Sequence, residues 1–342
     1  MIINWFIPEK GLSFSKLRQM CGLSPYNYNR HLASVWIRCL QLIPYFKSHG
    51  IDSLINDKRS KADIAIFLRR YDRVDFQLLK EQKNKGAKII IDLCVNFFDV
   101  TGSFVGGYGS TEKEKCKIEK IIKEADVITC SSDYIRNKAS NNHSWAVYIP
   151  DSIDLEHFKM KKVKQNFEKS KIYAIWAGQS VKISEVEELN KILKSRNISL
   201  IIISNEKPDL KYSFEYIPWS YYTFPSNILK GDLCISPRRI DNTYDLGHSH
   251  FKIGVFMAQG VPALAAPLPS YQEVIEKTGG GRICESDSEW KKALDEVLDN
   301  RQMLWEWSQA AYEGMRCYST ENIAKKNIEV FEKLISGEKV PF

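Results

Sequence analysis

The chain has 342 residues, and because a typical domain has about 150, its length predicts two domains. It is 44% hydrophobic and 27% charged, with 18 glycines and 12 prolines, a composition that excludes a disordered chain, a collagen-like repeat and a small disulfide scaffold. The net charge is +7, but residues 1–165 carry 27 Lys and Arg against 18 Asp and Glu, whereas the remainder carries 22 against 24. This asymmetry indicates either an anionic partner for the first half or a solvated lysine-rich surface.

Neither membrane nor metal patterns are present. No apolar run approaches the roughly 18 residues of a membrane span, and the first residues lack the pattern of a secretory signal, so we expect a cytoplasmic chain. The eight cysteines form no C-x-x-C pair and no H-E-x-x-H motif occurs, which favours scattered reduced thiols over a metal site.

Short β-branched runs alternate with helical patterns in the first half, as in parallel α/β folds. The predicted strands span residues 2–7, 63–68, 88–92, 127–130 and 147–149. The predicted helices span residues 32–49, 76–85 and 112–124. A charged stretch at 157–171 has little apolar periodicity and is typical of a linker.

The same alternation restarts after this stretch. Strands are predicted at residues 172–178, 200–204, 214–217, 232–236 and 263–266. Helices are predicted at residues 185–195, 249–259, 271–277, 288–298 and 301–335, the last with a break near 318–319. We therefore predict an α/β protein with a Rossmann-like domain at 1–160, a linker at 161–171, a second Rossmann-like domain at 172–318 and a final helix at 319–342. Ligands of such folds bind beyond the carboxyl ends of the strands, so we expect the chemistry in a cleft between the two halves.

The segment IYAIWAGQSVK is the first candidate site. A strand, a turn at Gly178 and a cation at Lys182 would direct backbone N–H groups and a positive charge at a phosphate. The segment matches neither G-x-x-x-x-G-K-[ST] nor G-x-G-x-x-G, and an ordinary strand-to-helix turn is the equal alternative.

The second candidate site follows the strand DLCIS, where Arg238 and Arg239 could contact phosphate oxygens. The next helix is expected to open at His248 and Ser249, with Ser249 as N-cap and Lys252 in the first turn. Free N–H groups, the helix dipole and a lysine would together seat a diphosphate.

A base-binding segment is expected upstream of these groups. The motif IPWS contains Ile217 and Trp219 at a strand end, where a nucleobase could stack or be read by the main chain. A packed core position is the alternative for Trp219.

These motifs resemble those of the GT-B glycosyltransferases of family 4, the glycosyl transferases group 1 type. The resemblance covers KIGVFMAQGVPALA, SYQEVI and CYSTENIAKKNIEVFEKL in the second half, and ADVITCSSDYIRNKA and VYIPDSIDLEHF in the first. It implies two domains facing a cleft, a nucleotide-diphosphate sugar such as a UDP-sugar on the second, an acceptor on the first, and a last helix that crosses back to the first domain. It also implies a retaining transfer.

The resemblance assigns residues to the donor. Lys252 matches the basic residue that contacts the diphosphate, and Gly178 and Lys182 match the turn near the phosphates. Ile217 and Trp219 match the base-contacting segment.

One motif of the family is absent. The E-x7-E pair would place glutamates at the positions of Gly247 and Val255, where the second binds the donor ribose. A divergent enzyme, or a copy that has lost catalysis, would both fit this departure.

The acceptor side offers several candidates. Asp92 closes a predicted strand and Asp99 lies in the loop after it. Both could act as catalytic or sugar-orienting carboxylates, with a helix cap or a surface ion pair as the alternative. Acceptor-binding candidates are Gly11, Ser13, Arg69 and Arg70. The glycine-rich loop at 100–110 resembles a lid or an acceptor cradle.

No D-x-D motif occurs in the chain, so cationic side chains rather than a metal are expected to neutralise the leaving diphosphate. We therefore predict a metal-independent glycosyltransferase with no bound cofactor, whose nucleotide-diphosphate sugar is a co-substrate. Its acceptor would be a saccharide or a lipid-linked molecule in cell-surface polysaccharide assembly, with peripheral contact to an anionic membrane.

Three alternatives stay open. A non-catalytic GT-B subunit that binds a nucleotide or a partner would explain the missing glutamates. A periplasmic-type binding protein would be expected to begin with a secretory signal, and the first residues lack that pattern. A nucleic-acid-binding protein has only the net charge in its favour.

Overall fold

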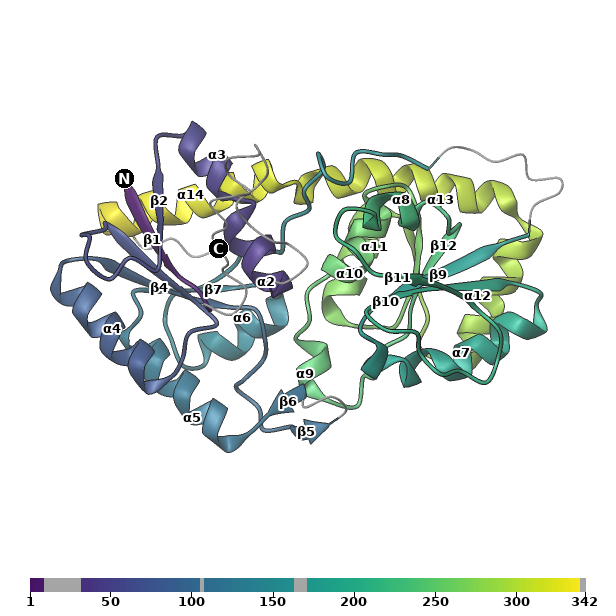
Figure 1. The fold of residues 1–342 in the computed structure, drawn as a ribbon, viewed down its shortest axis with the longest axis horizontal. Coiled ribbons are helices and arrows are strands. Elements are labelled where there is room, and N and C mark those ends of the chain that lie inside the picture. Colours follow the sequence, from purple (N-terminus) through teal and green to yellow (C-terminus); the bar gives the residue numbers. More distant parts are fainter. Residues whose placement is uncertain (9–31, 105–107, 163–170, 339–342) are drawn as a thin grey trace. The chain divides into compact units, whose positions relative to one another are not determined.

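The structure is a computed structural model and describes residues 1–8, 32–104, 108–162 and 171–338. The chain divides into two units. The first comprises residues 1–100, 110–152 and 320–342, and the second comprises residues 101–109 and 153–319. Figure 1 labels the elements of both.

The first unit is built on a six-stranded parallel sheet with the order β2-β1-β3-β4-β7-β8. All five residues of its central strand β3 are buried, which explains the continuous apolar sequence IAIFL. The strands are β1 (Ile2–Phe6), β2 (Asp52–Ile55), β3 (Ile64–Leu68), β4 (Lys88–Leu93), β7 (Val127–Cys130) and β8 (Ala146–Tyr148).

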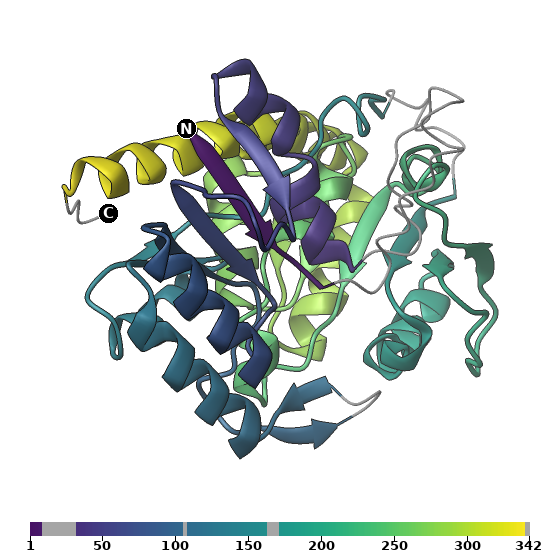
Figure 2. The ribbon, with the colours of Figure 1, turned by 60° about the vertical axis from the view of Figure 1, so that its left-hand side comes forward.

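Helices cover both faces of this sheet. In Figures 1 and 2, α4 and α5 lie side by side on one face, and α3 and α14 lie on the other. Phe331 of α14 packs edge-on against Phe46 of α3, with ring centroids 5.5 Å apart. The helical segments are α2 (Ala33–Val35), the π-helix η1 (Trp36–Leu40), α3 (Ile43–Ser48), α4 (Arg73–Asn84), α5 (Glu112–Ile121), η3 (Ile122–Glu124), α6 (Asp133–Ser140) and α14 (Thr320–Ser336).

The single helix expected at 32–49 is wrong in detail. The structure contains three segments there, because Pro44 lacks an N–H group and starts the new helix α3 in its first turn. The π-helical turn before it carries Arg38, which is buried.

The second unit also has a six-stranded parallel sheet, with the order β11-β10-β9-β12-β13-β14. The strand order reverses between β9 and β12, and ligands of open α/β sheets bind at such a switch point. The strands are β9 (Tyr173–Ala177), β10 (Ser199–Ser204), β11 (Glu215–Pro218), β12 (Leu233–Ser236), β13 (Ala263–Ala265) and β14 (Gly281–Ile283).

The helices of this unit bury one apolar core on each face of the sheet. They are η4 (Ser180–Lys182), α7 (Ser184–Ser195), α8 (Phe224–Ile228), α9 (Thr243–Leu246), α10 (Phe251–Met257), α11 (Pro269–Thr278), α12 (Asp287–Asp299), α13 (Arg301–Gly314) and η5 (Met315–Tyr318). A separate two-stranded sheet pairs β5 (Gly102–Phe104) with β6 (Tyr108–Ser110).

The second unit begins earlier than the predicted boundary at 161–171. Ile153 forms a parallel bridge with Ser319, and the Ile153 N–H donates to the Tyr318 carbonyl at 2.8 Å. Phe158 is 2% exposed and belongs to the core of the second unit. The final helix α14, in contrast, belongs to the first unit.

Within the described ranges, no helix combines the length and the apolar character needed to cross a membrane.

Candidate functional site

Buried charged side chains gather at the switch point of the second sheet. Lys182 follows β9, and Arg238 follows β12, so the two strands that flank the reversal deliver both cations to one edge. Arg238 lies 3.4 Å from Glu185 at the start of α7 and 3.7 Å from Asp245 on α9. Lys182 lies 3.9 Å from the same Asp245 oxygen.

Lys252 in the first turn of α10 is the third cation of this group: it lies over the ring of Trp176, which the turn at Gly178 contacts, and after burial the charges of Arg238, Glu185 and Lys182 shift its pKa. We call the five residues the cation cluster: Lys182, Arg238, Lys252, Glu185 and Asp245.

The ion pairs of the cation cluster are loose. Charge-assisted hydrogen bonds usually span about 2.7–2.9 Å, and the contacts here are 3.4–3.9 Å long. Glu185 Oε2, Arg238 Nε and Asp245 Oδ1 are buried and have no hydrogen-bond partner among the described residues. Buried polar atoms are nearly always paired, so this group is incomplete as it stands and fits an additional polar ligand.

Burial and repulsion between the cations lower the pKa of three of the basic groups, Lys182, Lys252 and His248. Burial, followed by the charge of Arg238, lowers the pKa of Lys182 from 10.5 to about 8. The same two causes, in the same order, hold the pKa of Lys252 well below its usual value. Burial and the charges of Arg238 and Lys182 also lower the pKa of His248, whose Nδ1 lies 3.1 Å from the Tyr244 carbonyl. A bound anion would relieve this repulsion.

The turn after β9 has a steric reason for its glycine. A Cβ on Gly178 would lie 2.6 Å from the ring of Trp176, which is closer than carbon atoms approach. The Lys252 ammonium lies 4.5 Å from the centroid of the Trp176 ring.

The predicted N-cap at Ser249 is wrong. The helix α10 begins at Phe251 and its N-cap is His250, whose side chain does not cap it, although Ser249 Oγ accepts from the Phe251 N–H at 3.5 Å. An additional helix, α9, which ends at Leu246, precedes this helix and was not predicted. With seven residues, α10 contributes little as a dipole, so side-chain cations supply the positive charge of the site.

In the described part of the chain, the other predicted donor residues make no ion pair or hydrogen bond with the cation cluster. Ile217 is a core residue of β11. Trp219 is partly buried against the same core, and its backbone N–H donates to the Ser204 carbonyl at 2.9 Å. Arg239 is exposed and pairs with Asp241 at 2.7 Å.

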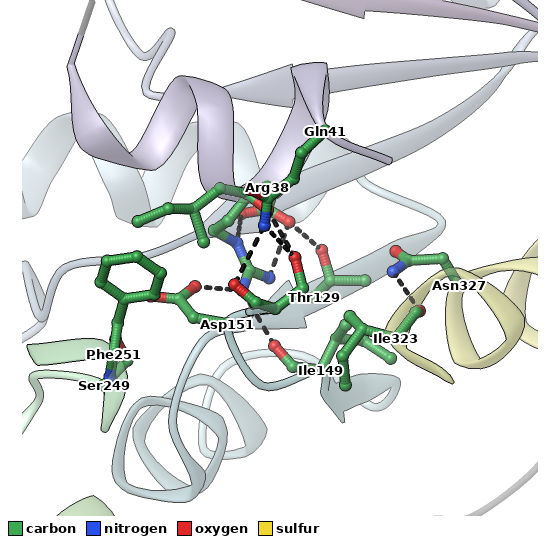
Figure 3. Close-up of polar contacts among 12 residues, drawn as sticks. Arg38, Gln41, Thr129, Ile149, Asp151, Ser249, Phe251, Ile323 and Asn327 are labelled. Atoms are coloured by element: carbon green, nitrogen blue, oxygen red, sulfur yellow. Dashed lines mark hydrogen bonds and ion pairs between the residues drawn. The ribbon is translucent and has the colours of Figure 1, made fainter. Parts of the chain in front are cut away.

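In the first unit, Asp92 is enclosed in a buried network (Figure 3). Arg38 donates to both Asp92 oxygens, from Nε at 2.7 Å and from Nη2 at 2.9 Å, and Thr129 donates to Oδ2 at 2.9 Å. Nη1 of Arg38 donates to Asp151 at 2.8 Å and to the Ile149 carbonyl at 2.9 Å. Both oxygens of Asp92 are therefore occupied, which favours a structural role for this carboxylate.

The sequence analysis missed Arg38. A lone arginine inside the apolar pattern VWIRCLQL was the available signal, since a charge is buried only when it is paired.

Asp99 is also paired, with Lys138 at 3.0 Å and Asn96 at 3.1 Å. Its side chain is 26% exposed, so it remains more accessible than Asp92.

The two arginines after β3 differ. Arg70 pairs with Asp75 at 2.5 Å. Arg69 has a left-handed backbone, with φ of 54°, and lines a pocket of about 170 Å³. The other residues of this pocket are Tyr71, Asp72, Phe97, Glu114, Lys117 and Ile118.

Two further predictions concern residues without a structural description here. Gly11 and Ser13 lie outside the described residues, as do positions 105–107 of the glycine-rich loop. Among the described residues, no three His, Cys, Asp or Glu side chains group as metal ligands would.

The fold is similar to that of several solved structures. Sucrose-phosphate synthase from Thermosynechococcus elongatus matches with a TM-score of 0.71 at 9% identity, over 98% of this chain and 100% of that one. HepE from Anabaena, crystallised in complex with UDP, matches with a TM-score of 0.66 at 9% identity, over 97% and 99%. TarM matches with a TM-score of 0.61 at 15% identity, over 85% of this chain and 57% of TarM.

No protein-family model matches the sequence, and no curated protein matches it either. The similarity therefore lies in the fold. The two parallel α/β sheets and the neighbours that span nearly the whole chain confirm the predicted fold class. The chain has the GT-B fold, in a form whose sequence has diverged far from those neighbours.

Proposed function

We propose that this protein is a glycosyltransferase that moves a sugar from a nucleotide-diphosphate sugar to an acceptor hydroxyl. The observation that carries the proposal is the cation cluster: at the switch point of the second sheet three cations outnumber two carboxylates, and the buried Arg238 Nε has no hydrogen-bond partner among the described residues. A diphosphate would balance the surplus positive charge and offer an acceptor to the unpaired Arg238 Nε–H.

The roles of the cations follow from the reaction. Breaking the bond between the sugar and the diphosphate places additional negative charge on the leaving phosphate oxygen. Lys182, Arg238 and Lys252 would bind that diphosphate and stabilise the developing charge. The absence of a D-x-D motif supports transfer without a metal.

A UDP-sugar is the proposed donor, because HepE, similar in fold, was crystallised with UDP and with UDP-glucose. A saccharide acceptor is proposed on the same footing, since TarM was crystallised with a GlcNAc-glycerol. The proposal of a lipid-linked acceptor on an anionic membrane is supported by the excess of Lys and Arg over Asp and Glu in the first half of the sequence. Cosedimentation with phosphatidylglycerol vesicles tests it, and equal recovery with neutral vesicles would contradict it.

One observation favours a second function, a nucleotide-binding subunit without catalysis. Val255 stands where the resemblance places the ribose-binding glutamate, and it is 1% exposed in the core, so it offers no polar contact.

A thermal-shift panel separates these possibilities. UDP, GDP, CDP, ADP and dTDP, and sugars of each, are added with and without EDTA. Stabilisation by one nucleotide that survives EDTA supports the proposed site, and no shift with any of them contradicts it. Release of UDP from a UDP-sugar in the presence of acceptor saccharides then distinguishes a transferase from a binding subunit.

A further inference from the structure

The three cations of the cation cluster have different partners. Arg238 has Glu185 and Asp245 within 3.7 Å, and Lys182 has Asp245 at 3.9 Å. Among the described residues, Lys252 has no carboxylate within ion-pair distance and no hydrogen bond. Its partner is the face of Trp176, at 4.5 Å.

This difference determines the net charge of the cluster. Two carboxylates compensate two of the three cations, so the charge that is left over corresponds to Lys252. An aromatic face attracts an ammonium group through its quadrupole but carries no charge of its own. It can therefore hold Lys252 in place and leave its positive charge available for an anion, which a carboxylate partner could not do.

The indole ring is itself fixed. Trp176 is 0% exposed in the apolar core between the sheet and α7, and its backbone pairs with Ile202 on β10. The turn at Gly178 lies directly against the ring, because a Cβ at that position would be 2.6 Å from two ring atoms. Trp176 thus reaches from the core to the same turn that precedes Lys182.

We propose that Trp176 is a positioning residue of the diphosphate site, whose ring face holds the Lys252 ammonium without neutralising it. The inference rests on the proposed function, since it assigns the diphosphate as the anion that Lys252 meets. Trp176 does not itself contact the diphosphate.

The test compares two buried tryptophans. Trp176→Leu removes the ring face beside Lys252, whereas Trp290→Leu, the matched control, removes a ring from the same apolar core, where it is 7% exposed. Calorimetry measures the affinity of each variant for UDP, for uridine and for inorganic pyrophosphate, which has no base. Both variants are expected to unfold more easily than the wild type, because each leaves a cavity.

The affinities should separate the two variants. Trp176→Leu should weaken UDP and pyrophosphate by roughly three- to thirtyfold, the range of a cation–π contact, with uridine unchanged. Trp290→Leu should change the affinities for all three by less than about twofold. In a Lys252→Met background, Trp176→Leu should have no further effect on UDP, because the coupled partner is already absent.

If Trp176→Leu does not fold, Trp176→Phe keeps a smaller aromatic face and should weaken UDP by roughly two- to fivefold. The inference is overturned if the loss for Trp176→Leu is the same with and without Lys252, or if Trp290→Leu shows the same phosphate-specific loss. If Lys252→Met weakens UDP but neither Trp176 variant does, the inference fails and the proposed function stands. If the wild type binds no nucleoside diphosphate, both the inference about Trp176 and the proposed function are contradicted.

Discussion

Each unit of this protein buries a group of charged residues, but the two groups are built differently. In the first unit, one arginine meets two carboxylates, and all its contacts to Asp92 and Asp151 are 2.7–2.9 Å long. In the second unit, Lys182 and Arg238 meet two carboxylates at 3.4–3.9 Å, Lys252 has no carboxylate partner among the described residues, and polar atoms remain unpaired. The first group is balanced by itself, whereas the second keeps an excess of positive charge and an unpaired Arg238 Nε–H, both of which suit an anion.

Burial and charge alone would not have separated these groups. Arg38 and Arg238 are both buried and both paired with two carboxylates. Hydrogen-bond completion is the difference: a satisfied buried network holds a fold together, and an unsatisfied one points to a ligand. Four experiments test this contrast.

The largest effect is expected in the first unit. Arg38→Met should lower the free energy of unfolding by about 3–5 kcal/mol, because it leaves buried carboxylates without their cation. Urea unfolding measures the change. Lys83→Met is the matched control in the same unit, since its pair with Glu124 is half exposed at 3.3 Å, and it should cost less than about 1 kcal/mol. Equal losses would contradict a structural role for the Arg38 network.

Removing a cation from the second unit, in contrast, should not lower the free energy of unfolding. Lys252→Met should leave the unliganded protein as stable as the wild type or more so, because it relieves the repulsion with Arg238 and Lys182. The affinity for UDP should fall by roughly ten- to a hundredfold, as expected for a lost charged hydrogen bond. Urea unfolding and calorimetry provide the two readouts. A loss of stability with unchanged UDP affinity would assign Lys252 to the fold instead.

The third experiment uses pH, with UDP-glucose as ligand because both phosphates of its diester keep a constant charge above pH 6. Below pH 8, Lys182 is protonated with or without ligand, so it adds no pH dependence to the affinity. Above its pKa of about 8, binding must take up a proton, so affinity should fall by up to about tenfold per pH unit. The lowered pKa of Lys252 adds to the same trend.

Calorimetry in two buffers of different ionisation heat measures this proton uptake, and Lys182→Met should show a smaller uptake. The unliganded protein should respond in the opposite direction. Because the pKa of Lys182 is about 8 when folded and 10.5 in the unfolded chain, unfolding takes up a proton between these values, and stability should rise with pH across that window. A flat profile for both quantities would contradict the repulsion inferred for the cluster.

The smallest effect is expected at Arg239. Its side chain is 56% exposed and pairs with the equally exposed Asp241. Arg239→Ala should therefore change UDP affinity by less than about threefold, whereas Arg238→Met removes a buried cation and should act as strongly as Lys252→Met. A tenfold loss for Arg239→Ala would restore it to the diphosphate site.

The sequence predicted the central strands well, because buried parallel strands are continuous β-branched runs. The runs ADIAIFL and ISLIIIS correspond to β3 and β10. It did not predict β2 or β14, whose sequences DSLI and GRI are mostly only half buried and lack that signal. The π-helical turn at Arg38 was also missed, and so was the pairing of Arg38 with Asp92, because that partner lies 54 residues away in the sequence.

The residues of the candidate site also fall into those that the sequence predicted and those that it did not. Gly178, Lys182, Arg238 and Lys252 were predicted because each lies shortly after a strand or at the start of a helix, a local position that the sequence shows. The residues Glu185, Asp245 and Trp176 were not assigned to it, because their contacts join segments that are far apart in the chain. The sequence shows which residues follow a strand, but it does not show which distant segments come into contact.

The discontinuity of the first unit has a consequence for how the protein is made. Helix α14, which packs Phe331 against Phe46, is synthesised after the whole of the second unit. A nascent chain that has completed the second unit still leaves part of the first core without its partner. Domains usually fold in order as they leave the ribosome, but here the first unit to emerge is the last to be completed, and a chain that stops before residue 320 would expose the face of α3 that α14 covers.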